Sequence, residues 1–487
     1  MVSLNRMTTS IPGLDVVLNG GLIAGGSYIL QGRPGAGKTI MANQIAFHRA
    51  AVGEKVLFVT LLSEAHEHLF SLLSTLSFFD RSQIGTNIQF VSAYREMANE
   101  GLDGVVQIIR REIAREKRSL FILDGLLNAR DRAETQQQIK RFVAELQGHA
   151  GFAGCTSLFL ASARLNDESP EHTMVDGVID LADEIFGARA VRRLEVRKMR
   201  GSSMLRGFHN FEITGSGIVV YPRMEAALRS MSEPERASGP MVSSGVPDFD
   251  RALGGGFRKG SFTLVMGPSG VGKTTLGLSF LSPASDAVRA LYFGFYEGPE
   301  RLKAKAASVG RDFDGMLSAG TLQIAWNPLG ENLLDQLGEK LLDHVRRQGT
   351  QRLFIDGVGA FRRALVYPSR LVEFFSALSN ELRGQGVTTV ASWETPDLFG
   401  GSVDAPAPEI SSIVENLVLL RFAEHHARIR RVLAIMKVRD ADYDTAVQEV
   451  VFGPNGLKLT PFRPTTTDVL DGSAHDVDHN IVRRSDT

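Results

Sequence analysis

Residues 11–39 read IPGLDVVLNGGLIAGGSYILQGRPGAGKT, and residues 246–274 repeat the pattern as VPDFDRALGGGFRKGSFTLVMGPSGVGKT. The second copy begins 235 positions after the first, at 246 instead of 11. Acidic and basic landmarks follow both copies in the same order and with nearly the same shift: Glu64 and Glu297, Asp124 and Asp356, Lys198 and Lys437. A repeat that keeps its spacing over so many positions indicates two duplicated domains.

The length of the chain agrees with two domains. At 487 residues, the chain exceeds the roughly 250–300 residues beyond which a single core stops growing. We predict a first domain at 1–225 and a second at 226–462, joined through the polar stretch SMSEPERASGP at 230–240. Residues 463–487 are polar and aperiodic, and we predict that they form a disordered tail.

Short apolar runs alternate with helical patterns in both copies. The runs are SYILQG, VLFVTLL, LFILDG and SLFLAS in the first copy and FTLVMG, ALYFGFY, RLFIDG and TTVASW in the second. Such runs predict buried parallel strands in a doubly wound α/β fold with helices on both faces of the sheet. Each copy then carries a Gly-rich turn, in FEITGSGIVVY and EVVFGPNGLKL, which predicts an antiparallel hairpin added to the sheet. This extension is typical of RecA-like domains.

The composition limits the classes of function. Lys and Arg total 54 against 55 Asp and Glu, so the net charge of -1 creates no overall field that favours nucleic acid or acidic lipid. The single cysteine, Cys155, cannot form an intrachain disulfide, and we interpret it as a buried core residue. We find no apolar segment with the length of a membrane helix, and we expect a cytoplasmic protein without membrane contact.

Both copies contain the phosphate-binding pattern G-x-x-x-x-G-K-[ST] between a predicted strand and a predicted helix. Glycines allow the backbone to wrap around phosphate oxygens, and the amides at the helix N-terminus attract anions. The lysine is expected to reach the β- and γ-phosphates. The predicted ATP-binding residues are Gly32, Pro34, Gly35, Ala36, Gly37, Lys38, Thr39, Gly267, Ser269, Gly270, Val271, Gly272, Lys273 and Thr274. The alternative, a Gly-rich turn that binds nothing, does not explain two matches in register.

A second acidic element ends one apolar strand in each copy, Asp124 in LFILDG and Asp356 in RLFIDG. A carboxylate at this place can hold a water on a Mg²⁺ ion beside the P-loop, while the P-loop threonine binds the ion directly. The predicted Mg²⁺ sites therefore consist of Thr39 with Asp124 and of Thr274 with Asp356. An aspartate that only forms a turn at the strand end is the alternative.

The candidate catalytic residues are Glu64 and Glu297, which follow the second predicted strand of their copies. A carboxylate there would face the γ-phosphate and could orient or deprotonate a water. A glutamate that only complements a helix dipole is the alternative. His66 and His68 lie beside Glu64, but residues two apart do not share a helix face, which argues against a metal site.

These motifs together resemble the KaiC family, whose members are ATPases with two RecA-like domains. The resemblance covers residues 11–459. Besides the P-loops, it rests on LEVRKMRGSSMLRGFHNFEITGSGIVVYP from Leu194, on SSGVPDFDRALGGGF from Ser243 and on the Lys437-Val-Arg439 segment. The resemblance implies ATP and Mg²⁺ as cofactors, a homohexamer with ATP at the subunit interfaces, and a KaiB-like or other signalling protein as partner.

In KaiC-like proteins, basic residues of one subunit contact the nucleotide of the next. The resemblance assigns this role to Lys198, Arg200 and Arg206 at the first site and to Lys437 and Arg439 at the second. The same residues could neutralise a triphosphate as an arginine finger does. A solvated basic strand is the alternative.

The sequence differs from the family pattern at the catalytic glutamates. The family has two adjacent glutamates after the second strand, and the aligned positions here are Leu62-Ser63 in the first copy and Tyr296-Glu297 in the second. Glu64 is displaced from the pattern. We therefore question the rate and even the presence of hydrolysis, above all in the first domain.

A pair of serines corresponds to the autophosphorylated Ser-Thr pair of the family. Ser411 and Ser412 occupy these positions in PEISSIVENLVLLRF. Hydroxyls presented to a neighbour's γ-phosphate could accept it if a carboxylate took the proton, and Glu297 is the candidate. Two serines before a strand are otherwise ordinary cap or loop residues, so both interpretations stay open.

The favoured function is a KaiC-like ATPase with serine autokinase activity that acts as a nucleotide-dependent signalling ring. A RecA- or RadA-like DNA-dependent ATPase is the first alternative, but it needs basic loops, often with aromatic residues. The candidate loops 129–135 and 165–174 are mixed in sign without an aromatic residue, and ETPDLFGGSVDAPAPEISS from Glu394 is acidic. We therefore do not expect nucleic acid as a partner. A non-hydrolysing scaffold held together by ATP is the second alternative.

Overall fold

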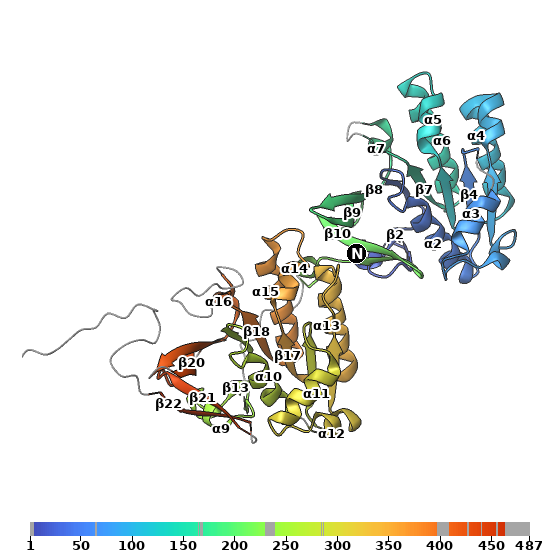
Figure 1. The fold of residues 1–487 in the computed structure, drawn as a ribbon. Coiled ribbons are helices and arrows are strands. Elements are labelled where there is room, and N and C mark those ends of the chain that lie inside the picture. Colours follow the sequence, from blue (N-terminus) through green and yellow to red (C-terminus); the bar gives the residue numbers. More distant parts are fainter. Residues whose placement is uncertain are drawn as a thin grey trace, which may run out of the picture. The chain divides into compact units, whose positions relative to one another are not determined.

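The computed structural model describes residues 4–63, 66–163, 165, 169–228, 239–283, 285, 287–396, 409–425, 428–439, 441–453 and 456–462. The chain divides into two compact units, Met1–Ala227 and Leu228–Thr487, and each is described by itself (Figure 1). The predicted tail at 463–487 and most of the predicted linker lie outside the described residues. Within the described ranges, no helix is both long and apolar enough to cross a lipid bilayer.

The first unit is built on a nine-stranded sheet with the order β11-β10-β9-β8-β3-β7-β6-β4-β5. The strands from β5 to β8 in this order are parallel, and β9, β10 and β11 continue the sheet in antiparallel pairs. The strands are β3 (Ser27–Gln31), β4 (Val56–Thr60), β5 (Ile88–Ser92), β6 (Leu120–Asp124), β7 (Thr156–Ala161), β8 (Gly177–Phe186), β9 (Arg189–Met199), β10 (Phe208–Thr214) and β11 (Gly217–Tyr221). The short strands β1 (Arg6–Met7) and β2 (Leu22–Ile23) pair separately.

Helices cover both faces of the first sheet (Figure 1). Because side chains alternate along a strand, Phe58 of β4 packs toward α2 (Lys38–Ala51), while Leu57 packs toward α4 (Tyr94–Arg115) and α6 (Gln136–Phe152). The two faces of the sheet therefore form two separate apolar cores. The remaining helices are α1 (Leu14–Val17), α3 (His66–Leu73), α5 (Leu126–Arg132), α7 (Pro170–Met174) and α8 (Met224–Ala227).

The second unit repeats this sheet strand for strand, in the order β16-β15-β17-β18-β14-β19-β20-β21-β22. The six strands from β16 to β19 are parallel, and the last three are added in antiparallel pairs. The strands are β14 (Phe262–Gly267), β15 (Arg289–Gly294), β16 (Leu322–Trp326), β17 (Thr350–Asp356), β18 (Thr388–Glu394), β19 (Asn416–His425), β20 (Arg428–Val438), β21 (Gln448–Gly453) and β22 (Gly456–Pro461). The short strands β12 (Met241–Val242) and β13 (Phe257–Arg258) pair separately.

The helices of the second unit also form two layers. Helix α10 (Lys273–Leu281) contacts β14, β17 and β18, and α13 (Leu334–Gln348) and α15 (Arg370–Gly384) contact strands of the same sheet. Figure 1 shows α13 and α15 together on one side of the unit. The remaining helices are α9 (Pro247–Ala252), α11 (Pro299–Ser308), α12 (Phe313–Ser318), α14 (Gly359–Arg363) and α16 (Ile410–Ile413).

The predicted α/β fold is confirmed, and so is the antiparallel extension of each sheet. The antiparallel part is larger than the predicted hairpin, because β8 and β9, and β19 and β20, form a second, longer hairpin. The far half of β8 alternates between partly buried and exposed residues, so no apolar run marks it. The edge strands β5 and β16 were also missing from the prediction. Only three of their ten residues are fully buried, and their sequences lack the continuous apolar pattern of the central strands.

Candidate nucleotide-binding sites

Both P-loops join the central strand of a sheet to the helix that follows, β3 to α2 and β14 to α10. Gly37 and Gly272, the last glycines of the loops, have φ angles of 98° and 119°, which favour glycine. A Cβ atom on Gly272 would lie 2.4 Å from the Phe452 ring. The turn into each helix therefore favours glycine on conformational grounds, and in the second unit the Phe452 ring adds a steric reason. The other predicted phosphate contacts, Gly32, Pro34, Gly35, Ala36, Gly267, Ser269, Gly270 and Val271, lie in these two loops.

The P-loop lysines fold over their own loops. Lys38 Nζ donates to the carbonyl oxygens of Gly32 and Arg33, both at 3.0 Å. Lys273 Nζ donates to Gly267 and Pro268, both at 2.7 Å. Burial lowers the pKa of both lysines, and nearby carboxylates oppose this effect. Each ammonium group is thus held over the loop whose amides would surround a phosphate.

The structure brings together the residues predicted to hold Mg²⁺. Thr39 Oγ1 donates to Asp124 Oδ2 at 3.3 Å, and Thr274 Oγ1 donates to Asp356 Oδ2 at 3.0 Å. The pairs meet because β6 and β17 end beside the P-loops, separated from β3 and β14 by one strand. Hydroxyl and carboxylate oxygens form a donor set that suits this ion.

Two hydroxyl groups of neighbouring strands contact the aspartate of the second unit, and apolar residues stand at the matching strand positions of the first. Tyr292 Oη donates to Asp356 Oδ2 at 3.0 Å, and Ser392 Oγ donates to Oδ1 at 2.7 Å. Burial raises the pKa of Asp356, and these hydroxyl donors oppose the rise. By strand register, Phe58 and Leu160 take the places of Tyr292 and Ser392 in the first unit. The sequence comparison of the copies did not reveal this difference.

A cavity of about 750 Å³ opens at the P-loop of the second unit. Its wall combines the P-loop with charged residues and with aromatic side chains from several strands. Lining residues beyond the P-loop include Tyr296, Glu297, Lys305, Asp356, Trp393, Glu394 and Phe452. The cavity therefore offers charged groups next to the phosphate loop and apolar surface beside it.

The two units differ at the predicted catalytic glutamates. Glu297 lines the cavity, and its Oε1 accepts from Lys305 Nζ at 2.7 Å. Its Oε2 is buried without a hydrogen-bond partner among the described residues. In the first unit, strand register places Ser63 at the position of Glu297, three residues beyond the strand partner of the aspartate. Glu64 lies outside the described residues.

The basic pairs lie beside the short helix that precedes β8 or β19. Lys198 Nζ donates to the carbonyl of His172 at 2.7 Å, and Arg200 donates to Thr173 at 2.9 Å. Burial and the adjacent arginine lower the pKa of Lys198. A cavity of about 420 Å³ is lined by His172, Thr173 and Lys198 among others. Arg206 is exposed in the loop between β9 and β10.

The second unit repeats this contact with the two candidate phosphoacceptor serines. Lys437 Nζ donates to the carbonyls of Ser411 and Val414, at 2.5 and 2.9 Å, and Arg439 donates to that of Ser412 at 2.8 Å. The Ser412 hydroxyl donates to the carbonyl of Glu409 at 2.7 Å. The structure thus brings together two groups that the sequence analysis treated separately, the basic pair and the serine pair.

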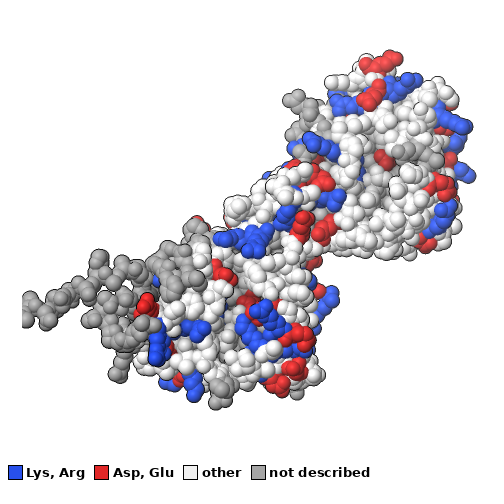
Figure 2. Space-filling model, in the orientation of Figure 1, with Lys and Arg blue, Asp and Glu red and all other residues white. Residues whose placement is uncertain are grey.

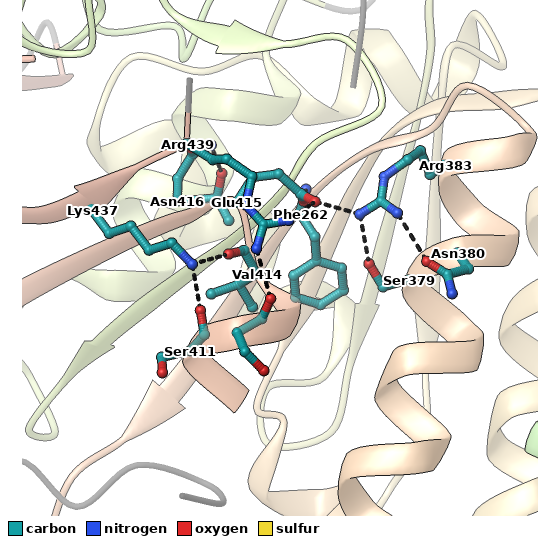
Figure 3. A network of polar contacts seen from close by, with 12 residues as sticks. Phe262, Ser379, Asn380, Arg383, Ser411, Val414, Glu415, Asn416, Lys437 and Arg439 are labelled. Atoms are coloured by element: carbon teal, nitrogen blue, oxygen red, sulfur yellow. Dashed lines mark hydrogen bonds and ion pairs between the residues drawn. The ribbon is translucent and has the colours of Figure 1, made fainter. Parts of the chain in front are cut away.

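A buried carboxylate that the sequence analysis missed connects these groups to the sheet (Figure 3). Glu415 Oε2 accepts from the Phe262 amide at 2.7 Å, and its Oε1 accepts from Arg383 of α15. Arg439 lies 3.9 Å from the same oxygen. In the first unit, Asp176 accepts in the same way from the Ser27 amide at 2.9 Å. Both copies thus carry an acidic residue just before β8 or β19. This repeated residue is the sequence signal that could have revealed the buried carboxylate.

The basic and serine pairs lie at the end of the sheet opposite the P-loop of their own unit. Strands β14 and β19 run parallel, and the P-loop follows the last residue of β14. Helix α16, which carries Ser411 and Ser412, precedes β19, and Lys437 pairs with Leu417 near its start. A strand of 6 residues separates the two ends, on the order of 15 Å or more. Lys198 pairs with Val178, the second residue of β8, so the first unit has the same arrangement.

Comparison with known proteins places both units in one family. A family model described as a KaiC ATPase matches residues 7–225 and again residues 242–463. The circadian clock oscillator protein KaiC of Picosynechococcus sp. is 26% identical over 491 residues, which cover 96% of this chain and 92% of the relative. KaiC of Synechococcus elongatus is also 26% identical, with 97% and 92% covered. The circadian clock protein KaiC3 of Synechocystis sp. is 26% identical, with 96% and 94% covered. Because the model matches most of the chain, once in each unit, the protein belongs to the KaiC family of ATPases.

Proposed function

We propose that this protein is a Mg²⁺-dependent ATPase that assembles into a ring of identical subunits, with the ATP of one chain contacted by basic residues of the next. The position of the basic pairs carries this proposal. Lys198 with Arg200, and Lys437 with Arg439, lie opposite the P-loop of their own unit. A basic pair at that end is too far from its own P-loop to act there, but it can act on a neighbour's triphosphate as an arginine finger does.

The proposed ring is a hexamer in the cytoplasm that signals through its nucleotide state. The support comes from curated relatives named as circadian clock proteins, which match both units over nearly their whole length. A KaiB-like or other signalling protein is the proposed partner. Nucleic acid is not a proposed partner, because Lys and Arg side chains are interspersed with Asp and Glu on the visible surface of each unit (Figure 2).

Mg²⁺ is the proposed metal at both sites. The hydroxyl of Thr39 or Thr274 would bind the ion directly, and the carboxylate of Asp124 or Asp356 would hold it through a water. The ion would neutralise charge on the β- and γ-phosphate oxygens. The hydrogen bonds between each threonine and aspartate support this, because they hold two oxygen donors side by side.

The second unit is the proposed autokinase, with Ser411 or Ser412 as acceptor. Both serines belong to α16, and the ammonium of Lys437 donates to the carbonyl of Ser411. A neighbour's nucleotide that reached Lys437 would therefore also approach the two serine hydroxyls.

The first unit is proposed to hold ATP with slower turnover than the second. Ser63 stands where Glu297 stands in the second unit, and a hydroxyl is a much weaker proton acceptor than a carboxylate. The sequence analysis left open a non-hydrolysing scaffold that ATP holds together. We propose this role for the first units of the assembled chains and not for the second units.

We expect Mg·ATP to assemble the protein into hexamers, as measured by native mass spectrometry. Lys38→Ala should reduce assembly more than the matched change Lys273→Ala, because a site with slow turnover keeps its ATP at the interface for longer. Equal masses with and without Mg·ATP would contradict the ring. A larger loss with Lys273→Ala would contradict the division between the two units.

Phosphorylation between chains can be tested by mixing two inactive variants. Lys273→Ala keeps both serines but loses the second P-loop lysine, whereas the double variant Ser411→Ala/Ser412→Ala keeps the P-loop and loses both acceptors. With γ-labelled ATP, neither variant alone should be labelled on α16, and the mixture should be labelled on the Lys273→Ala chain. Phosphopeptide mapping assigns the label. Wild-type protein without label on Ser411 or Ser412 would remove the autokinase proposal, and labelled Lys273→Ala protein alone would argue against transfer from the second site.

A further inference from the structure

We propose that Glu394 is the proton acceptor of the second ATP site. It lies at the end of β18, whereas the sequence pattern predicts catalytic glutamates only after the second strand of each copy. This inference rests on the proposed hydrolysis of ATP in the second unit. Glu394 is the last residue of β18, and it follows TTVASW, the fourth apolar run of the second copy, 97 residues after Glu297.

The strand order places Glu394 between the two parts of the site. Strand β18 lies between β14, which leads into the P-loop, and β17, which ends at Asp356. Glu394 pairs in register with Gly267, the first residue of the P-loop, and the amide of Thr395 donates to the Gly267 carbonyl at 3.1 Å. Neighbouring strands lie about 4.8 Å apart, so the Glu394 backbone lies directly beside the start of the phosphate loop.

The side chain of Glu394 lines the nucleotide cavity. Residues two apart in a strand share a face, and the hydroxyl of Ser392, two residues earlier, donates to Asp356 at 2.7 Å. Glu394 itself is exposed to the cavity. Burial lowers the pKa of Lys273, and the charge of Glu394 opposes this more strongly than that of Asp356. Lys273 Nζ donates to the carbonyl of Gly267, the strand partner of Glu394, so the carboxylate lies on the same side of the cavity as the ammonium group expected to hold the γ-phosphate.

Glu297 and Glu394 differ in how they are held. Glu297 forms an ion pair with Lys305, whose Nζ lies 2.7 Å from Oε1, so one of its carboxylate oxygens is already engaged by a cation. Within the described part of the chain, Glu394 has neither a hydrogen bond nor an ion pair through its side chain. Neither of its carboxylate oxygens is thus engaged by another side chain, and both are available to a water.

The proposed step is the attack of a water on the γ-phosphorus. The water oxygen forms a bond to phosphorus while the bond from phosphorus to the β–γ bridging oxygen breaks. Glu394 takes the proton of the water and later releases it to solvent, and ADP and inorganic phosphate leave. Lys273 neutralises charge on the phosphates, and Glu297, which also lines the cavity, remains paired with Lys305.

The first unit provides a natural comparison. Strand register places Ser162 at the position of Glu394 and Ser63 at the position of Glu297. Neither described position carries a carboxylate. The proposal therefore predicts that the difference in turnover between the units depends on both positions.

The test compares phosphate release by the full-length protein and by Glu394→Gln, Glu297→Gln and Ser162→Ala. The part of the wild-type rate that Lys273→Ala removes defines hydrolysis at the second site. Glu394→Gln should reduce this part by about 10²-fold or more, as expected for loss of a proton acceptor. Ser162→Ala should leave it unchanged, and Glu297→Gln should reduce it less than Glu394→Gln. Formate should restore part of the activity of Glu394→Ala, because a small carboxylate can occupy the vacated space.

Binding must be measured at the same time. Trp326 and Trp393, the two tryptophans of the chain, belong to the second unit, and Trp393 lines the cavity, so tryptophan fluorescence reports on ATP at this site. Unchanged ATP binding by Glu394→Gln would support a role in the chemical step. If the Lys273-dependent rate survives in Glu394→Gln, or if formate does not rescue Glu394→Ala, Glu394 is not the proton acceptor. The proposed hydrolysis in the second unit would not be affected by this result. A rate that Lys273→Ala does not reduce overturns hydrolysis in the second unit and this inference with it.

Discussion

Lys273→Ala is expected to reduce ATP hydrolysis at the second site by about 10²-fold or more, because it removes a cation placed over the transferred phosphoryl group. Lys273 lines the cavity and is held by two carbonyls of its own loop, so its ammonium group is already positioned where phosphate would bind. The fluorescence response of Trp393 to Mg·ATP should be lost as well. Stopped-flow phosphate release and a fluorescence titration measure the two effects.

Lys38→Ala is the matched control for this prediction. It removes the equivalent lysine from the first unit, which contains no tryptophan. The tryptophan response to Mg·ATP should therefore persist in Lys38→Ala when the protein is assembled at high concentration. A wild-type fluorescence response in Lys273→Ala would show that ATP binds the second unit without this lysine.

Arg383→Leu should destabilise the second unit by about 3–5 kcal/mol, since it leaves a buried carboxylate without its cation. Arg383 and Glu415 form an ion pair in which both side chains are no more than 10% exposed. The same carboxylate accepts from the Phe262 amide and lies near Arg439, so the loss would also loosen the strand that carries the basic pair. Urea unfolding followed by tryptophan fluorescence measures the free energy of unfolding of this unit.

Two variants control for other causes of a loss in stability. Arg347→Leu breaks an ion pair with Asp343 whose side chains are 80% and 44% exposed, and a surface pair of this kind contributes about 0–1 kcal/mol. Adding Glu415→Gln to Arg383→Leu removes the unpaired charge and should recover part of the loss. Equal effects of Arg383→Leu and Arg347→Leu would show that the pair with Glu415 has no special role.

The sequence predicted the parts of the site that depend on local order. The P-loop pattern needs only a strand, a Gly-rich turn and a helix that are consecutive in the chain, and both loops have this context. The aspartates were predicted because each ends a continuous apolar run in both copies, and the structure brings each of them to the threonine of its P-loop. Glu394 also ends such a run, but a serine replaces it in the first copy, so the comparison of copies did not mark it.

By itself, the sequence determined the α/β class, the duplication and the two P-loop motifs between strand and helix, because each is encoded in residues close together in the chain. The tertiary structure alone decided that the basic and serine pairs lie opposite their own P-loop, that Glu415 meets Arg383, and that Glu394 lies between the P-loop and Asp356. The physical reason is strand order: parallel pairing joins segments more than 100 residues apart, such as Phe262–Gly267 and Thr388–Glu394. The spacing of residues along the chain does not show which strands become neighbours, because strand order depends on how the helices pack over the whole sheet.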